Sequence, residues 1–489
     1  MSRGLANDLQ VQANSNHEGV LVEIPGSLSS PVQIPELIEE ILSHLVGPNI
    51  LSAVRVCKTW SDPALNQLWR NLSSLVPLLS LIGPIQCQNG EDMDFIHDIH
   101  GADWSRYAFY ARRVRNITLA DFPYQKPVSV HAVQKFVEYI PSHLATSLVT
   151  SITTFSVSPT PLPLQVVPFI SQSLRKLKLK FSFHTEPSLD STVFQSMLAA
   201  VRAAATLPNS SLEELDLSSH TTDTDLCVVI TNCLAKHRST ISKLSLYLLM
   251  DHQVWSSIYN LPFLREVAVS PFKSSELGES ASIIPMIQEL VKAQPLLERF
   301  CVSLPASGFG PPEGPDLYGS IIRQLLGLHN LRSVAVYASA FLLLSENDIR
   351  EMGVSWPHVR AVRLQPHTAW STPGQLAETD LSTLPSFLRH FPCLEELDLP
   401  FRCDSLPPAE QPVLKSVLRV LEVSGSPVPR VDVEQVAAYL ASVLPPTTHV
   451  KISAFMIGGD ARAIWHEIIR RVKVIRDERS QNPTNALQT

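Results

Sequence analysis

The sequence is poor in charge. Only 17% of its 489 residues are Asp, Glu, Lys or Arg, whereas 45% are hydrophobic. About a quarter of the residues are charged in an average soluble domain, so the low share indicates a large buried surface. The net charge of −7 lacks the basic excess that is typical of nucleic-acid-binding proteins. We therefore expect no nucleic acid among the partners.

Cysteines are few and scattered. The seven cysteines never form a C-x-x-C pair, and residues 1–23 are polar and lack the apolar core of a signal sequence. This pattern predicts reduced thiols and a location in the cytoplasm, the nucleus or both. No apolar stretch approaches the length of a membrane span, so we expect no membrane among the partners.

Catalytic motifs are missing as well. The chain contains no G-x-S-x-G, P-loop, G-x-G-x-x-G or H-E-x-x-H pattern, which argues against a hydrolase hidden in its loops. The segment EDMDFIHDIHGAD (91–103) carries residue types that bind metals, but a short acidic stretch of this kind is typical of an exposed connector. We expect no enzyme, no cofactor and no metal site.

The N-terminal part predicts three short helices after a mobile tail at residues 1–30. The first helix has Pro35 in its first turn and Gly47 as a stop, and these apolar residues recur in it at helical spacing: Leu37, Ile38, Ile41, Leu42 and Leu45. The second is expected from Asn49, and the third from the pair Asp62-Pro63. Helices within about 40 residues rarely form a sufficient core alone. The unit therefore needs a further surface to pack against.

The rest of the chain repeats one pattern, in which an apolar residue is followed by another after three positions and a third after two more. A helical period, a turn and often a proline precede each occurrence, as in FPCLEELDL (391–399). The spacing of roughly 30 residues is typical of leucine-rich repeats, whose units bury their apolar faces only by stacking. The triplets are Val114-Ile117-Leu119, Ile152-Phe155-Val157, Leu174-Leu177-Leu179, Leu212-Leu215-Leu217, Ile241-Leu244-Leu246, Leu264-Val267-Val269, Leu297-Phe300-Val302, Leu331-Val334-Val336, Val359-Val362-Leu364, Leu394-Leu397-Leu399, Leu418-Leu421-Val423 and a weak Val450-Ile452.

These patterns predict an α/β fold: a three-helix unit followed by an irregular solenoid with a curved parallel sheet and outer helices. A last helix, from Asp460 to about Arg476, has an apolar face suited to capping the open end of the stack. Its basic residues Arg470, Arg471, Lys473 and Arg476 are interpreted as a solvated helix end, with a lipid- or nucleic-acid-binding patch as the less favoured alternative.

The N-terminal unit resembles the F-box family. IPELIEEILSHL (34–45), VCKTW (56–60) and DPALNQLWRNL (62–72) match the family's Pro-containing opening, its Val-Cys-x-x-Trp and its Leu-Trp-Arg in order and spacing. Ile34 replaces the usual Leu, and Glu36 follows Pro35 one residue early. The alternative interpretation is that these helices only form a cap on the repeats.

A second stretch is similar to a segment in F-box/leucine-rich-repeat proteins of mushroom-forming fungi. DWSRYAFYARRVRNITL (103–119) matches their Trp-x-Arg followed by Tyr-x-Arg-Arg-Val, which leads into the first repeat strand. This match depends on fewer fixed positions than the first. It supports the same family.

The resemblance implies a non-catalytic adaptor. In the family, the F-box docks onto a Skp-family adaptor, which links it to a cullin in an E3 ubiquitin ligase, and the repeats hold a protein substrate. Leu68 and Trp69 would pack inside the unit. The matching positions imply these adaptor-binding residues: Pro35, Leu37, Ile38, Ile41, Leu45, Val56 and Trp60.

The alternating strand positions that point away from the core predict the substrate-binding face. These positions carry both signs of charge, so they form either a polar groove or solvated cross-strand ion pairs. The candidate substrate-binding residues are Lys176, Lys178, Lys180, Glu214, Asp216, Tyr247, Arg299, Arg363 and Asp398.

The sequence thus predicts six segments and one leading function, a substrate-recognition subunit of a Skp–cullin–F-box ubiquitin ligase. The open alternative is a leucine-rich-repeat scaffold for protein binding unrelated to ubiquitination. The expected segments are a mobile tail (1–30), an F-box (31–75), a linker (76–108), leucine-rich repeats (109–459), a capping helix (460–479) and a tail (480–489).

Overall fold

A computed structural model describes most of the chain from residue 34 to residue 481. The described residues are 34–87, 92–120, 126–141, 144, 149–156, 165–181, 190–208, 211–218, 224–248, 250–270, 283–304, 317–338, 344–366, 379–403, 406, 416–423, 426, 432–452 and 459–481. The expected tail at 1–30 and most of the tail at 480–489 lie outside them. The chain divides into two compact units, Met1–Leu212 and Glu213–Thr489, and each is described by itself.

Unit 1 begins with a helical trio formed by α2 (Pro35–Ser43), α3 (Gly47–Val54) and α4 (Lys58–Arg70). The trio has its own small core. Two of its expected boundaries were wrong. Gly47 has a positive φ of 27° and begins α3 instead of ending α2. The third helix starts one turn before Asp62, because extended backbone at Cys57 lets its carbonyl accept the Ser61 amide at 2.9 Å. Pro63 therefore lies inside α4.

The trio continues directly into a parallel sheet. Strand β1 (Asn71–Leu72) follows α4 without a linker and pairs with β4 (Asn116–Ala120), with Leu72 opposite Ile117. The sheet of unit 1 continues through β5 (Ser151–Ser156) and β6 (Lys176–Phe181), both parallel to β4. The intervening helices are α6 (Ser105–Ala111), α7 (Val130–Tyr139), the 3-10 helix η3 (Val167–Phe169) and α9 (Asp190–Thr206).

The segment expected to be a linker, residues 76–108, is packed instead. It contains α5 (Val76–Leu79), the antiparallel pair β2 (Ile85–Cys87) and β3 (Met93–Phe95), and the start of α6. Leu78, Leu79 and Phe95 are almost fully buried. These elements are too short to show a hydrophobic period, which is why the sequence pattern did not indicate them.

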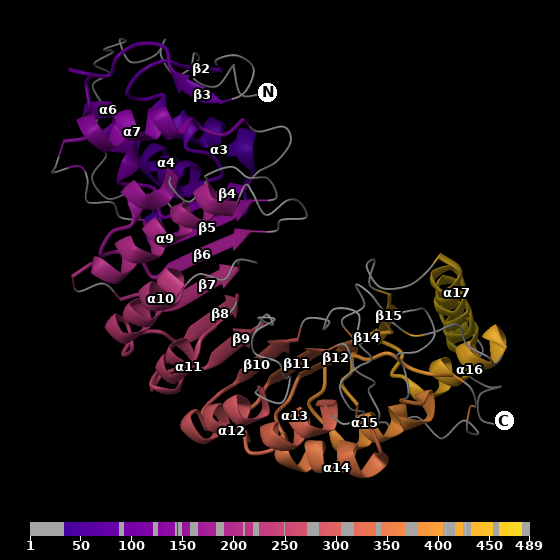
Figure 1. Cartoon of the computed structure of the whole chain (residues 1–489). Helices are drawn as coiled ribbons and strands as arrows, with labels where there is room; N and C mark the ends of the chain where they lie inside the picture. The colour runs from indigo at the N-terminus through magenta and orange to yellow at the C-terminus, as the bar shows by residue number, and fades with distance from the viewer. Residues whose placement is uncertain are drawn as a thin grey trace. The chain divides into compact units, whose positions relative to one another are not determined.

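Unit 2 is a run of parallel strands in sequence order. A helix lies between each strand and the next, except between β13 and β14, where much of the connection lies outside the described residues. In Figure 1 the helices α10 to α15 all lie on one side of these strands, as right-handed crossovers require. The strands are β7 (Glu214–Ser218), β8 (Lys243–Tyr247), β9 (Glu266–Val269), β10 (Arg299–Ser303), β11 (Ser333–Ala338), β12 (Ala361–Pro366), β13 (Glu396–Asp398), β14 (Val420–Glu422) and β15 (His449–Lys451). The helices are α10 (Thr224–Lys236), α11 (His252–Tyr259), α12 (Ile283–Ala293), α13 (Leu317–Leu325), α14 (Glu346–Ser355), η7 (Leu381–Thr383), α15 (Leu384–His390), α16 (Val433–Val443) and α17 (Gly459–Gln481).

The repeated apolar triplet forms the core between the sheet and these helices. Its members from Leu174 to Val423 are at most 2% exposed. This arrangement confirms the predicted fold class: N-terminal helices followed by an α/β solenoid of the leucine-rich-repeat kind.

One triplet was assigned in the wrong register. Ile152 pairs with Leu177, and Thr154 pairs with Leu179, so the buried members on β5 are Val149, Ile152 and Thr154. Phe155 is 43% exposed, and Val157 lies outside the described residues. The polar Thr154 at a core position hid the correct spacing from a search for apolar residues.

The last helix, α17, packs against α16 and buries Trp465, Ile468 and Val472. It extends to Gln481 and so includes the first two residues of the expected C-terminal tail. All seven cysteines are free thiols. Among the described helices, none combines the length and the apolar character that crossing a membrane requires.

Candidate functional site

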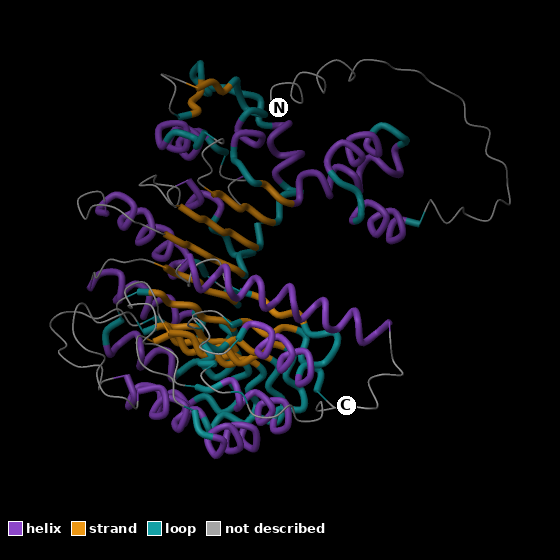
Figure 2. The backbone as a smooth tube through the Cα atoms, turned by 90° about the vertical axis from the view of Figure 1, so that its right-hand side faces the viewer, coloured by secondary structure: helices purple, strands orange, loops and turns teal. Residues whose placement is uncertain are grey.

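An exposed apolar strip lies along α2. Ile34, Leu37 and Ile41 recur at intervals of three and four residues, so they share one face of the helix. Their exposed fractions are 39%, 44% and 43%, and Val56, between α3 and α4, is 65% exposed. Such side chains are costly to leave in water when they could be buried. In Figure 2 the trio lies to one side of the strands of unit 1.

The residues expected to contact an adaptor divide into three groups. Leu37, Ile41 and Val56, together with Pro35, are exposed and can meet a partner directly. Leu45 and Trp60 are partly buried against the core of the trio. Ile38 has no exposed surface. A direct contact through Ile38 therefore does not fit the structure, because its side chain packs inside the trio and holds the strip in place.

The opposite side of α2 borders a groove with charges of opposite sign on its walls. Glu36, Glu39 and Glu40 of α2 line one side, and the other is lined by Arg70, Arg113 and Arg115. The acidic face of α2 is thus turned toward the repeats, and its apolar strip is turned away from them. The acidic residues of α2 therefore border the groove, and its exposed apolar strip does not.

The stretch Tyr110–Val114 joins the trio to the first repeats. The Arg113 side chain is only 4% exposed; its guanidinium donates to Asp62 at 2.6 Å and also to Asn66, both in α4. It lies over the Phe109 ring at 4.5 Å. The Tyr110 ring packs against the Trp69 ring in a tilted arrangement, with ring centroids 4.6 Å apart. The Tyr-x-Arg-Arg-Val pattern therefore has a physical role here: it fixes α4 against the repeats.

The second candidate site is the face of the unit 2 sheet that carries the alternating polar positions. Cys301, Arg363 and Asp398 occupy one register row through β10, β11, β12 and β13. The Arg363 guanidinium donates to Glu396 at 2.5 Å, and the Gln365 amide donates to Asp398. Polar side chains on this face are thus paired with one another across neighbouring strands.

Several of the expected substrate-binding residues are less accessible than expected. Asp216 and Asp398 are each 5% exposed, so neither presents a surface to a large partner. The Tyr247 hydroxyl lies 3.9 Å from the Cys301 sulfur, and burial raises the pKa of Tyr247. Arg299 is exposed, whereas Glu214 and Arg363 are half-buried. Lys176, Lys178 and Lys180 lie on β6 in unit 1, where Lys176 is exposed and the others are half-buried.

The buried Asp398 predicts a stability that depends on pH. Burial raises its pKa to about 7, despite the hydrogen bond from Gln365. A carboxyl whose pKa is higher in the folded state favours folding most at low pH, and this contribution is lost as the pH rises from about 4 to 7. We expect Asp398→Asn to be more stable than the wild type at pH 8 and to match it near pH 4. Urea titrations across this range measure the difference, and a constant difference would contradict the assignment.

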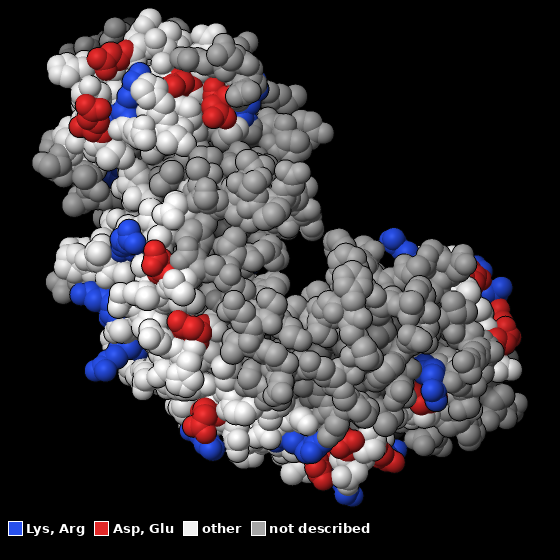
Figure 3. Space-filling model, in the orientation of Figure 1, with Lys and Arg blue, Asp and Glu red and all other residues white. Residues whose placement is uncertain are grey.

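A further set of charged residues was missed by the sequence reasoning. The residue just before each strand of unit 2 is often Arg or Glu: Arg265, Glu298, Arg332, Arg360, Glu395 and Arg419. Each follows directly on the first apolar residue of its triplet, so the repeat pattern would have located the row. Figure 3 shows the described charges of both signs interspersed on the face that it draws. Within the described residues, no group of His, Cys, Asp or Glu could hold a metal ion.

The fold and these surfaces define a repeat protein with a small helical domain at the N-terminal end of its described part. Comparison with family models identifies that domain: residues 35–74 match the F-box-like family. The chain therefore carries an F-box-like domain, of the kind that generally binds Skp-family adaptors and works without catalysis.

No curated protein sequence matches the chain. A similar solved structure is a Bacteroides fragilis protein from a structural genomics programme, with 10% identity. The match covers 53% of this chain and 73% of that one, with a TM-score of 0.29. A score this low supports no conclusion about function.

Proposed function

We propose that this protein is the substrate-recognition subunit of a Skp–cullin–F-box ubiquitin ligase that acts in the cytoplasm, the nucleus or both. The trio binds the Skp-family adaptor and, through it, a cullin. The repeats bind a protein substrate and bring it near the ubiquitin-charged enzyme, which raises its effective concentration. The protein itself does no chemistry. We also propose that the 103–119 segment reflects kinship with fungal F-box/leucine-rich-repeat proteins.

The apolar strip of Ile34, Leu37 and Ile41 is the observation that supports this proposal most. A helical cap on the repeats would turn its apolar strip toward them. Here the trio has a separate core, and the three residues are about two-fifths exposed and do not line the groove between α2 and the first repeat strands. An exposed apolar strip of this kind on a small, independently packed unit fits a docking surface.

The test truncates three exposed apolar residues of the trio, two of them in the strip, without touching its core. We expect Leu37→Ala, Ile41→Ala and Val56→Ala together to weaken adaptor binding roughly 30-fold, about 2 kcal/mol, because each truncation removes apolar area that would be buried on docking. The affinity of the full-length chain for the purified Skp-family adaptor of its host, measured by calorimetry, checks this.

The matched control truncates three exposed apolar residues of unit 2. Phe263, Leu296 and Val354 are 59%, 65% and 77% exposed. Their combined replacement by alanine should leave the adaptor affinity unchanged. An unaltered affinity in the Leu37, Ile41 and Val56 variant would falsify the docking assignment. A wild-type chain that captures no adaptor would instead favour a protein-binding scaffold unrelated to ubiquitination.

A further inference from the structure

A row of charged residues crosses unit 2 where its strands begin. This rim row consists of Glu213, Ser242, Arg265, Glu298, Arg332, Arg360, Glu395 and Arg419, the residues that immediately precede β7 to β14. Each amide from Ser242 onward donates to the carbonyl of the preceding member, as between Arg360 and Arg332 at 2.7 Å. The row is therefore continuous, and its members are spaced at the distance between neighbouring strands, about 4.8 Å.

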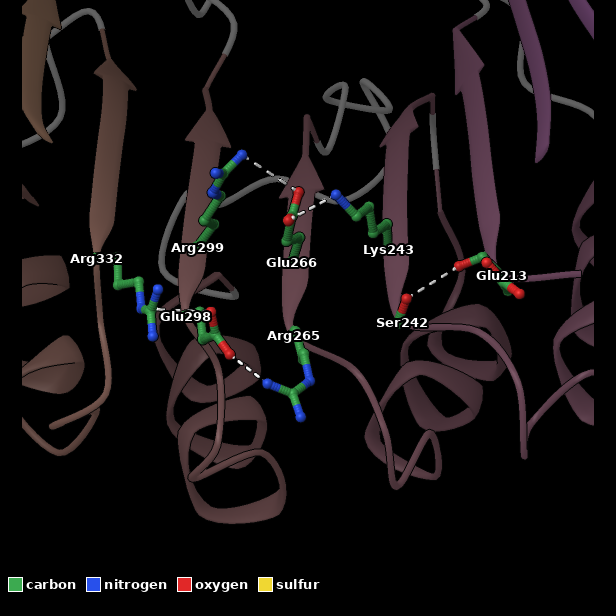
Figure 4. Close-up of polar contacts among 8 residues, drawn as sticks. All are labelled: Glu213, Ser242, Lys243, Arg265, Glu266, Glu298, Arg299 and Arg332. Atoms are coloured by element: carbon green, nitrogen blue, oxygen red, sulfur yellow. Dashed lines mark hydrogen bonds and ion pairs between the residues drawn. The ribbon is translucent and has the colours of Figure 1, made fainter. Parts of the chain in front are cut away.

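Each of two glutamates in the rim row is shared by two arginines. Glu298 lies 2.5 Å from Arg265 and 3.4 Å from Arg332, as Figure 4 shows. Glu395 lies 3.4 Å from Arg360 and 3.8 Å from Arg419. The glutamate side chains are 24% and 29% exposed, whereas the four arginines are between 58% and 73% exposed. A partner that approaches the row thus meets mainly guanidinium groups.

The order of charges departs from what sheet stability favours. Opposite charges on neighbouring strands stabilise a sheet, and like charges directly opposite each other destabilise it. The order from Arg265 to Arg419 is Arg, Glu, Arg, Arg, Glu, Arg, so Arg332 and Arg360 are direct neighbours on paired strands. Each of the two is paired with the glutamate on its other side, Arg332 with Glu298 and Arg360 with Glu395, so two Arg–Glu–Arg sets, each with one more cation than anion, meet at this pair. An anion seated between the two guanidiniums would contact both sets.

The first residues of β7 to β14 carry both signs of charge: Lys243 and Arg299 are cations, and Glu214, Glu266 and Glu396 are anions. Within this set Glu266 is paired with Lys243 at 2.8 Å and with Arg299 at 3.6 Å (Figure 4), so the cationic excess is confined to the arginines of the rim row and to these three residues. The chain as a whole has a net charge of −7. A local basic excess on an acidic protein provides charge complementarity for an acidic partner.

We propose that the rim row binds an acidic segment of a protein substrate, with a carboxylate or phosphate held between Arg332 and Arg360. The planar, multiply donating guanidinium suits both groups. That the acidic segment belongs to a substrate rests on the proposed function. That the rim row binds an acidic protein segment rests only on the residues of the row.

The test measures the binding of defined peptides to the full-length chain by fluorescence anisotropy. The probes are a labelled extended peptide of alternating Glu and Ser, a twin with Gln in place of every Glu, and a copy of that Gln twin with phosphoserine in place of Ser. We expect the two anionic peptides to bind and the neutral twin not to bind. Added salt should weaken binding, because the row is exposed to solvent.

The decisive variant is Arg332→Gln with Arg360→Gln. It should weaken binding of the anionic peptides about tenfold, since two charge-assisted contacts are lost at an exposed site. The control, Arg238→Gln with Arg350→Gln, makes the same change of charge at exposed positions outside the row and should leave binding unchanged. A thermal melt of each variant checks folding, and the single Arg332→Gln variant repeats the test if the double variant is unstable.

Three results would overturn the inference: no binding of either anionic peptide, equal binding of the neutral twin, or unchanged affinity in the Arg332 and Arg360 variant. Preference between the carboxylate and phosphoserine peptides identifies the anion. The assay contains no adaptor, so it is independent of docking by the trio. If adaptor capture fails while the peptide result holds, the ubiquitin-ligase role is lost and acidic recognition stands.

Discussion

Leu42→Ala should unfold the helical trio and leave unit 2 folded. Leu42 has no exposed surface and belongs to a core of only five buried residues. A buried Leu→Ala change costs about 3 to 4 kcal/mol. A core of this size rarely supplies more than about 3 to 5 kcal/mol in total, so the change removes most of the stability of the trio. Adaptor binding should weaken with it, because the adaptor must then bind the small folded fraction of the trio.

Hydrogen exchange followed by mass spectrometry separates this outcome from a global effect. Amides of residues 35–70 should exchange almost freely in Leu42→Ala, and those in the described helices and strands of unit 2 should stay protected. The control is Leu37→Ala, which lies on the same helix but is 44% exposed and should keep the protection of the trio. Excess adaptor, at about a hundred times its dissociation constant, should restore about 2.7 kcal/mol of protection in Leu42→Ala if its folded state still binds. Full protection in the free Leu42→Ala variant would show that the repeats, rather than this core, hold the trio together.

The contrast between Leu37 and Leu42 also shows what the sequence could and could not predict. The helical period placed both residues on the apolar side of α2, and the resemblance selected that side for docking. It did not divide the side into a buried part and an exposed part, because that division depends on where α4 crosses α2. Ile38 was therefore assigned to the docking surface, although it is fully buried.

The repeat pattern predicted the core better than it predicted the polar surface. Leu215, Leu244 and Val267 had to be buried, because a strand with one apolar face must turn it to the helices. Exposure of the polar positions depends on the segments around them. Asp398 was expected on an open face and is buried, while the accessible arginines lie one residue before the strands. The spacing of apolar residues does not show which polar side chains the neighbouring segments will bury.

The junction between the trio and the repeats was the least predictable part. Strand β1 has only two residues and pairs with β4 across more than forty positions of sequence, so no local pattern marks it. Arg113, whose contacts reach back to Asp62 and Asn66, fixes the same junction through side chains. Long-range pairs of this kind are determined by the folded chain. The consequence is that α4 continues directly into the sheet of unit 1.

Trp465→Ala should release α17 from the end of unit 2. Trp465 is fully buried, and replacing a buried Trp by Ala costs about 3 to 5 kcal/mol. The remaining anchors are the smaller apolar side chains Ile468 and Val472 and two hydrogen bonds, from Arg476 to the Thr448 carbonyl at 2.7 Å and from Arg479 to the Ala441 carbonyl at 3.1 Å. We expect these to hold the helix poorly once its largest apolar contact is lost. The buried side chains of α16 should then become exposed.

Limited proteolysis and hydrogen exchange over residues 433–481 measure this release. Val474→Ala is the matched control on the same helix, since Val474 is 36% exposed and its loss should cost less than about 1 kcal/mol. The outcome also decides between the two interpretations of the basic residues. Arg471 pairs with Glu434 of α16 at 3.1 Å, so the cap interpretation predicts that Arg471→Gln loosens α17 slightly. A helix that stays protected in Trp465→Ala would be held by other contacts, and its arginines would then need a role outside the cap.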